Sequence, residues 1–348
     1  MPDILRMCSQ AEQLDFSQNF LIARPNYLGD LIFPDQKTQN FKAEYLRLAA
    51  GAQLPTMALI HGLDTEAHIA SRPAMERVTV EKLFIKDKIN QTESLRQALE
   101  NGVYEENALI DFVYNDWARL AENVRCRSEV AKMEVLASGK MTIKENGLNF
   151  AVNFGVPTAN TNFTLDVSTP DKDVLGQIEA IVDAAREKGF TLSGMVTSST
   201  VVSKMLTNNG ISKAIYGGAG AGAMVTRSQL SALFGELFGF TEIRTNDQRY
   251  NLEGKDGKLT TQRFYPKNKV SFMASYNGLR NFGVGLWGVT PEENTLGGWT
   301  DKSAEQFITL TQWVENDPTA VWSKASGLFV PVLPNPEGLF IATATLSA

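Results

Sequence analysis

The chain is poor in the side chains on which most enzyme and metal sites depend. Its 348 residues include two cysteines, Cys8 and Cys126, and two histidines, His61 and His68. The cysteines lack CxxC spacing, so neither a zinc site nor a disulfide framework is indicated, and the content is typical of folding in a reducing cytoplasm. The histidines do not have the i, i+4 spacing of a zinc-binding helix. We interpret them as surface residues.

Positive charge and long apolar runs are scarce as well. The 33 Lys and Arg residues are outnumbered by 39 Asp and Glu residues, which gives a net charge of −6. A dedicated nucleic-acid binder is disfavoured, because neutralising phosphates supplies most of the affinity of such proteins. No apolar run approaches the ~20 residues that cross a bilayer, and the N-terminal residues lack the basic start and apolar core of a signal peptide. We therefore expect no membrane partner.

Glycine, in contrast, is concentrated in one stretch, AIYGGAGAGAMVT, at residues 214–226. Gly218, Gly220 and Ala223 match the G-x-G-x-x-G/A pattern of dinucleotide sites, which also needs a strand before it, a helix after it and an acid about 20 residues on. The preceding ISKAIY is a poor strand, an acid such as Glu242 occurs by chance in any chain, and no Lys-Ser or Lys-Thr follows as in a P-loop. The favoured interpretation is a mobile loop between two helices, and the alternative is an α/β nucleotide-binding enzyme. The glycines of this predicted flexible loop are Gly217, Gly218, Gly220 and Gly222.

Other reactive groups have structural interpretations. Cys126 lies between Arg125 and Arg127 inside a long helical pattern, so we expect a buried or half-buried thiol rather than a nucleophile. Asp171 and Asp173 suit the first turn of a helix, where the helix dipole favours acids. The chain also lacks the G-x-S-x-G motif of a nucleophile elbow. We expect no catalytic, cofactor-binding or metal site.

The pattern of apolar residues predicts a long helix over 107–138. The stretch contains no proline, and its apolar residues recur with a period near 3.6. Asn107 can cap the start, and Gly139 can close the end in a left-handed conformation. At 1.5 Å per residue such a helix is roughly 45–50 Å long, which suits a spine on which other elements pack.

The chain before this helix has two regions of different pattern. Residues 1–56 show no lasting period and suit an arm that lies on another surface. MERVTVEKLFIKDKIN, residues 75–90, alternates apolar and charged residues and predicts one or two long strands. Their charged face meets either solvent or a neighbouring subunit. The candidate inter-subunit contacts on this face are Arg77, Glu81, Lys82 and Lys86.

After the helix, Asn146-Gly147 predicts a hairpin, and residues 169–300 predict a separate α/β unit. Thr169-Pro170 is expected to start the first helix of this unit, and Asn208-Asn209-Gly210 to close its second. A third helix carries an apolar face of Leu230, Leu233, Phe234, Leu237 and Phe238. The other expected elements are a strand at 192–196, a hairpin turning at 255–257 and a strand after Pro266. The tail is expected to form strands that return to the spine helix.

Several stretches carry a resemblance to a known family. EAHIASR at 66–72 precedes the charged strands, and SEVAKMEVLASGKMTI ends the long helix and enters a hairpin. YPKNKVSFMAS, NGLRNFGVGLWG and DPTAVWSKASGLFVPVLPNP follow in the C-terminal third. In this succession, over nearly the whole chain, the sequence resembles the major capsid proteins of phage lambda type, the phage capsid protein E family.

The resemblance implies an α+β fold, the major capsid fold that tailed phages share with herpesviruses. It implies a major capsid protein of a tailed double-stranded DNA phage, which assembles as pentamers and hexamers into an icosahedral shell around the genome. The glycine loop is then a flexible loop of the axial domain, able to fit several environments. The alternative is a nanocompartment shell protein of the same fold. The implied parts are an N-terminal arm (1–37), an extended hairpin called the E-loop (38–92), a peripheral domain with the spine helix 107–138 (93–165 and 302–348) and an α/β axial domain (166–301).

The resemblance also implies partners and a location. The partners are copies of the chain itself, a scaffolding protein, a portal, a decoration protein and packaged double-stranded DNA, which is contacted without sequence specificity. The location is the virion, after assembly in the host cytoplasm. The acidic balance suits such a shell, because strong phosphate contacts would hinder the movement of DNA during packing and release.

Overall fold

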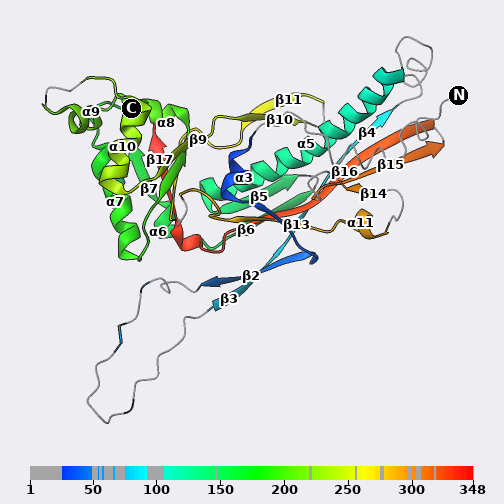
Figure 1. The fold of residues 1–348 in the computed structure, drawn as a ribbon, viewed down its shortest axis with the longest axis horizontal. Coiled ribbons are helices and arrows are strands. Elements are labelled where there is room, and N and C mark those ends of the chain that lie inside the picture. Colours follow the sequence, from blue (N-terminus) through cyan, green and yellow to red (C-terminus); the bar gives the residue numbers. More distant parts are fainter. Residues whose placement is uncertain are drawn as a thin grey trace.

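The described part of the chain forms an elongated molecule, with a long helix along one half and a group of shorter helices at one end (Figure 1). The computed structural model describes residues 26–48, 54, 57–58, 66, 75–91, 106–145, 147–218, 222–254, 257–274, 278–295, 300–302, 307–316 and 319–347. The buried apolar side chains fall into two cores, a first core around the long helix and a second core among the shorter helices. The predicted α+β fold class is confirmed.

The long helix, α5, spans Glu106–Ser138, as its period predicts, but it already includes Glu106, so Asn107 lies inside the helix and is not its cap. It ends at Gly139, which has a left-handed φ of 69° and donates its amide to the carbonyl of Val135 at 2.7 Å. Most side chains from 128 to 137 are buried, because elements of both halves of the molecule pack around this end of the helix. The helix therefore connects the two halves.

A six-stranded sheet packs on α5. Its strands are β1 (Asp35–Lys37), β4 (Leu83–Gln91), β13 (Val284–Gly288), β14 (Thr300–Lys302), β15 (Thr309–Asn316) and β16 (Thr319–Val332). β16 is central: β4 pairs along one edge, whereas β15 and then β13 pair along the other, all antiparallel. β1 continues the sheet in parallel beside β13. The tail thus returns to the spine helix through β15 and β16, as predicted. Two short helices, α3 (Leu28–Ile32) and α11 (Pro291–Thr295), pack on α5 and on β14 and β15, respectively.

Three two-stranded ribbons accompany this body. They are β2 (Lys42–Leu48) with β3 (Met75–Glu81), β5 (Lys140–Glu145) with β6 (Leu148–Asn153), and β10 (Arg249–Glu253) with β11 (Leu259–Arg263). Gly147 and Gly257 have φ values of 82° and 73°, which supports the two predicted hairpin turns. The β2–β3 ribbon lies in the predicted E-loop and extends away from the body (Figure 1). Its first strand falls in the region that showed no sequence period.

A five-stranded mixed sheet forms the other half. Its strands, in spatial order, are β7 (Phe163–Asp166), β17 (Leu339–Thr345), β12 (Lys269–Met273), β8 (Gly194–Thr197) and β9 (Glu242–Thr245). The four main helices gather around it at one end of the molecule (Figure 1). They are α7 (Val174–Glu187), α8 (Ser199–Leu206), α9 (Asn209–Tyr216) and α10 (Arg227–Phe238). The short helices α6 (Thr158–Thr161) and η2 (Pro336–Gly338) complete this half.

The predicted start of the first of these helices is corrected. α7 begins at Val174 and not at Thr169-Pro170. Asp173 provides the physical reason, because its carboxylate accepts the amide of Gly176 at 2.9 Å and caps the first turn. Asp173 is therefore the N-cap, and neither it nor Asp171 lies in the first turn, where the sequence analysis places them.

Two further corrections concern α9 and α10. α9 was not predicted, because Asn208 was interpreted only as the end of α8; its side chain instead accepts the amide of Ile211 at 3.1 Å and starts the next helix. Leu237 of α10 is exposed and does not belong to the apolar face. The buried row of α10, spaced four residues apart, is Leu230, Phe234 and Phe238.

The domain bounds implied by the resemblance stay a prediction, and strand pairing gives two reasons to move them. β17 lies within 302–348, yet it pairs with β7 and β12 in the five-stranded sheet. β13 lies within 166–301, yet it pairs with β1 and β16 in the six-stranded sheet. The chain therefore passes between its two halves more often than the sequence suggests.

Candidate assembly surfaces

The outer face of the β2–β3 ribbon carries two of the four candidate contact residues. Glu81 lies opposite Lys42, with Oε1 3.3 Å from the lysine Nζ, and Arg77 lies diagonal to Glu44 at 3.9 Å. Such exposed pairs contribute little to stability and can exchange partners easily. Beyond these pairs, towards the far end of the ribbon, Leu46 and Met75 are 61% and 63% exposed. Exposed apolar side chains next to charged ones are typical of a protein interface. The outer-face residues are Lys42, Glu44, Leu46, Met75, Arg77, Thr79 and Glu81.

Lys82 and Lys86 lie in different surroundings. Lys82 is 4% exposed and donates to the Thr38 hydroxyl and the Asn40 carbonyl of its own chain, and burial lowers its pKa. We therefore do not carry Lys82 forward as a contact residue, because its ammonium group is used inside the subunit. Lys86 is exposed on β4, with its Nζ 4.5 Å from the centre of the Phe84 ring.

A cation–aromatic cluster that the sequence analysis missed lies near Lys86. Lys88, two residues further along β4, places its Nζ 4.0 Å from the ring centre of Trp322. Trp322 stacks on Trp313 with ring centres 6.2 Å apart and donates Nε1 to Glu315 at 2.7 Å. The alternation of Phe84, Lys86 and Lys88 is the available signal, but the partner of Lys88, Trp322, comes from a strand more than 200 residues later. In cation–π contacts of this kind, the ammonium group of the lysine is attracted to the face of the aromatic ring.

An ionic cluster around a buried lysine fixes the segment that precedes the ribbon. Lys132 of α5 is 0% exposed, and its Nζ lies 2.7 Å from Asp30 Oδ1 and 2.8 Å from Asp35 Oδ1. One turn earlier, Glu129 Oε1 accepts the amide of Gly29 at 3.0 Å. A Cβ on Gly29 would lie 2.0 Å from Glu129 Oε2, so only glycine permits this approach. We name these residues the anchor: Gly29, Asp30, Asp35, Glu129 and Lys132.

The anchor perturbs the ionisation of its members. Burial raises the pKa of Glu129 to about 7, and Asp30 and Asp35 act in the same direction, whereas the Gly29 amide and Lys132 oppose them. Burial alone would lower the pKa of Lys132, but the two aspartates outweigh it and the pKa is raised. The anchor thus combines a lysine shared by Asp30 and Asp35 with a neighbouring glutamate, Glu129, whose pKa is raised to about 7.

The glycine loop begins and ends at fixed points. Gly217 follows α9 with a φ of 80°, and Gly222 has a φ of 85° and donates its amide to Asn209 Oδ1 at 3.0 Å. No atom lies within 4 Å of a Cβ built on Gly217, Gly218 or Gly222. Gly220 lies outside the described residues. A helix and not a strand precedes the loop, so the structural context of a dinucleotide site is missing among the described residues.

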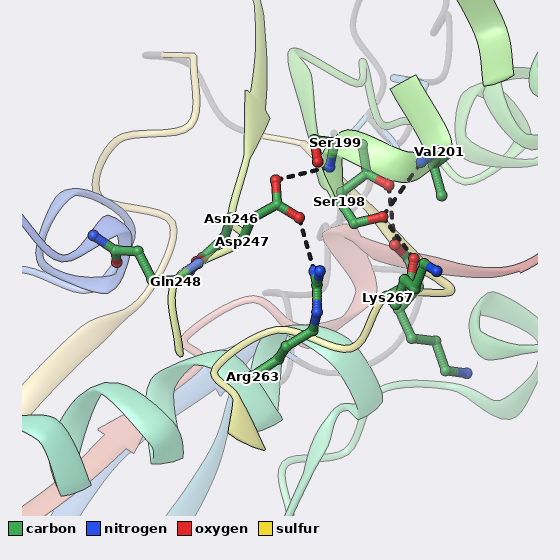
Figure 2. A network of polar contacts seen from close by, with 10 residues as sticks. Ser198, Ser199, Val201, Asn246, Asp247, Gln248, Arg263 and Lys267 are labelled. Atoms are coloured by element: carbon green, nitrogen blue, oxygen red, sulfur yellow. Dashed lines mark hydrogen bonds and ion pairs between the residues drawn. The ribbon is translucent and has the colours of Figure 1, made fainter. Parts of the chain in front are cut away.

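A polar network joins the five-stranded sheet to α5. Asp247 accepts the amide of Ser199 at 3.0 Å, at the start of α8, and the guanidinium of Arg263 at 2.8 Å (Figure 2). Partial burial raises the pKa of Asp247, but the hydrogen bonds from Ser199 and Arg263 outweigh it and the pKa is lowered. The adjacent Asn246 places its Nδ2 3.3 Å from the sulfur of Met133 on α5. The network positions two elements and has the character of a structural junction.

The described residues offer little reactive chemistry. Burial raises the pKa of the Cys126 thiol to about 11, which suits a structural thiol. Asp171 accepts Asn209 Nδ2 at 2.6 Å and so supports the glycine loop. Within the described ranges there is no group of three or more metal-ligating side chains, and no helix is long and apolar enough to cross a membrane. Cys8, His61 and His68 lie outside the described residues.

Solved structures with this fold include a phage-related protein and a phage capsid protein. A phage-related protein from Bordetella bronchiseptica RB50 has a TM-score of 0.58 and 12% identity, with 95% of each chain covered. A chain of the capsid asymmetric unit of cyanophage A-1(L) has a TM-score of 0.52 and 11% identity, with 99% of this chain and 98% of that chain covered. No curated protein matches by sequence. The fold is therefore that of a phage shell protein.

The family follows from the sequence match. The family model described as phage major capsid protein E matches residues 11–344, so the chain belongs to this family. The resemblance stated above is confirmed, and the chain is a major capsid protein of the tailed-phage type. The match favours a phage shell over the nanocompartment and nucleotide-enzyme alternatives.

Proposed function

We propose that the chain builds an icosahedral shell from pentamers and hexamers of itself, with the outer face of the β2–β3 ribbon as a main contact between subunits. The exposed pair of Leu46 and Met75 carries this proposal. A two-stranded ribbon is marginally stable alone, so its outer face gains most by packing on a second molecule. Arg77, opposite Leu46, and Glu81, further along β3, carry charges of both signs on the same face. We include Lys86 as a further contact residue, since it is exposed beside Phe84.

The glycine loop is proposed to lie near the centre of each pentamer and hexamer. A shell places one sequence in several slightly different environments, and a segment without side-chain contacts adapts to them at low cost. Gly217, Gly218 and Gly222 have open space around them, which supports this role. Gly220 belongs to the same proposed loop.

The remaining partners follow from the family. We propose a scaffolding protein, a portal and a decoration protein as partners, and packaged double-stranded DNA without sequence-specific contact. We propose that the chain is not an enzyme, that it assembles in the host cytoplasm and that it remains in the virion. The net charge of −6 supports a weak interaction with DNA, because it provides no excess of cations for the phosphates.

The test compares two leucines on two ribbons. Leu46→Asp places a charge in the proposed interface, whereas Leu259→Asp changes a leucine of similar exposure, 65%, on the β10–β11 ribbon. In negative-stain electron microscopy, wild type and Leu259→Asp are expected to give closed shells, tubes or rings of hexamers, and Leu46→Asp only small particles. Circular dichroism should show all three proteins folded. Normal shells from Leu46→Asp would remove the ribbon from the proposal.

A further inference from the structure

The inner face of the β2–β3 ribbon is not free. Ala43 and Val80 are buried, and Tyr45 and Val78 pack against the first core. Side chains alternate along a strand, so these four residues share one face and the exposed Leu46 belongs to the other. One face of the ribbon therefore packs on its own subunit, and the other face is exposed.

Arg47 lies on the inner face near the end of β2. It contacts the residue that follows β6. Its Nη1 donates to the carbonyl of Phe154 at 3.3 Å, and its Nη2 pairs with Glu76, the residue opposite it on β3. Phe154 is itself fixed, because its side chain is buried and its amide donates to the carbonyl of Gly139 at 3.2 Å. One guanidinium thus ties both strands of the ribbon to the end of the spine helix.

The site that receives the guanidinium is shaped by a glycine. Gly155 has a φ of 82°, and a Cβ there would lie 1.9 Å from Arg47 Nη1 and 3.0 Å from its Cζ. Any other residue would be strained at this φ and would also displace the guanidinium. A lysine would not reproduce this geometry, because its donors share one nitrogen, whereas Arg47 serves the two acceptors from two separate nitrogens of a planar group.

We propose that Arg47, Glu76 and Gly155 form a clamp that sets the direction in which the ribbon leaves the body before any neighbour binds. The clamp makes Arg47 a positioning residue for assembly: it orients the outer face and does not itself touch the partner. A preorganised contact surface loses less conformational freedom on binding, so assembly gains affinity and geometric uniformity. This inference rests on the proposed function of the ribbon for its role in assembly, but the clamp itself is a property of the single subunit.

The test measures hydrogen–deuterium exchange of the β2 and β3 amides in unassembled subunits. Arg47→Ala should raise exchange in this ribbon by about tenfold, since it removes one charge-assisted contact network. Arg77→Ala is the matched control, because it removes an arginine from the outer face of the same ribbon and should leave exchange unchanged. Exchange in β12 and β17 should stay at the wild-type level in both variants and so verifies folding. Wild-type exchange of the ribbon in Arg47→Ala would overturn the proposal.

A second variant tests the geometry independently. Gly155→Ala should loosen the ribbon with Arg47 intact, and the double variant Arg47→Ala/Gly155→Ala should be no looser than Gly155→Ala, because both changes break one contact. Additive effects would show two unrelated perturbations and overturn the clamp. In electron microscopy, Arg47→Ala is expected to give irregular shells or tubes. If Leu46→Asp assembles normally while Arg47→Ala still loosens the ribbon, the proposed interface fails and the clamp stands.

Discussion

The anchor makes a quantitative prediction about pH. Glu129 is buried beside Asp30 and Asp35, and its pKa rises from 4.5 to about 7 on folding. Because the folded-state pKa is the higher one, the folded protein binds this proton more tightly than the unfolded chain does. The resulting stabilisation is fully present below about pH 4.5 and is lost as the pH rises through 7. The substitution Glu129→Gln removes the titration and keeps an oxygen that can accept the Gly29 amide.

The magnitude follows from the two pKa values. At about 1.4 kcal/mol per pKa unit, the difference between 4.5 and about 7 corresponds to about 3 kcal/mol. Between pH 4.5 and pH 8, the unfolding free energy of the wild type should therefore fall by about 3 kcal/mol relative to that of Glu129→Gln. At pH 8 the variant should be the more stable protein, because it places no additional negative charge beside the two aspartates.

The assay is urea unfolding of unassembled subunits, followed by tryptophan fluorescence at a series of pH values. Other groups titrate in the same range, so the informative quantity is the difference between wild type and variant at each pH. Glu179→Gln, an exposed glutamate on α7, is the matched control and should follow the wild-type curve throughout. Parallel wild-type and Glu129→Gln curves would refute the argument that burial within the anchor keeps Glu129 protonated near neutral pH.

Three further substitutions test single contacts. Asp247→Ala should lower the unfolding free energy by about 1–2 kcal/mol in urea unfolding, because the start of α8 and Arg263 both lose their acceptor; an unchanged midpoint would make the junction dispensable. Gly222 has a φ of 85°, whereas Gly218 has no positive φ, and both have open space around them. Gly222→Ala should therefore lower the unfolding free energy by about 1 kcal/mol more than Gly218→Ala does. Equal melting temperatures of the two variants in thermal unfolding would contradict this. Trp117→Phe should lower the unfolding free energy by about 1–2 kcal/mol, because the buried hydroxyl of Ser323 on β16 loses its indole donor. An unchanged urea midpoint would show that another donor replaces the indole.

The sequence was sufficient where a structure is set by neighbouring residues. The period of α5 and the glycine at its end are local signals, and the structure confirms both. Asn208 shows the limit of such signals, because asparagine is favoured both after helix ends and at helix starts, and here it caps the start of α9. Only the packing of α9 against its neighbours decides between the two interpretations.

The anchor could not be predicted in this way. Lys132 and Asp30 are 102 positions apart, and each alone is an ordinary charged residue of a helix or a turn. Arg47 and Phe154 are 107 positions apart, and their contact depends on the room left by Gly155. Contacts of this range are decided by the tertiary fold, and the resemblance to a family supplied the fold without supplying the pairs.

The two halves of the subunit are joined too firmly to account for adaptation in a shell. Ser271 of β12 donates its hydroxyl to the carbonyl of Leu136 on α5 at 2.7 Å, in a fully buried position. The Ser271 hydroxyl also lies 2.7 Å from the Tyr265 hydroxyl, so breaking the contact with Leu136 would disrupt a buried polar network, at a cost of about 1–3 kcal/mol for a group left unpaired. The β2–β3 ribbon and the ends of the glycine loop involve no such fully buried bond: Gly217, Gly218 and Gly222 lack Cβ contacts, and the two bonds of Arg47 lie at a part-buried and an exposed position. We therefore expect the differences between pentamer and hexamer subunits to concentrate in these two segments, while the junction around Ser271 keeps one geometry.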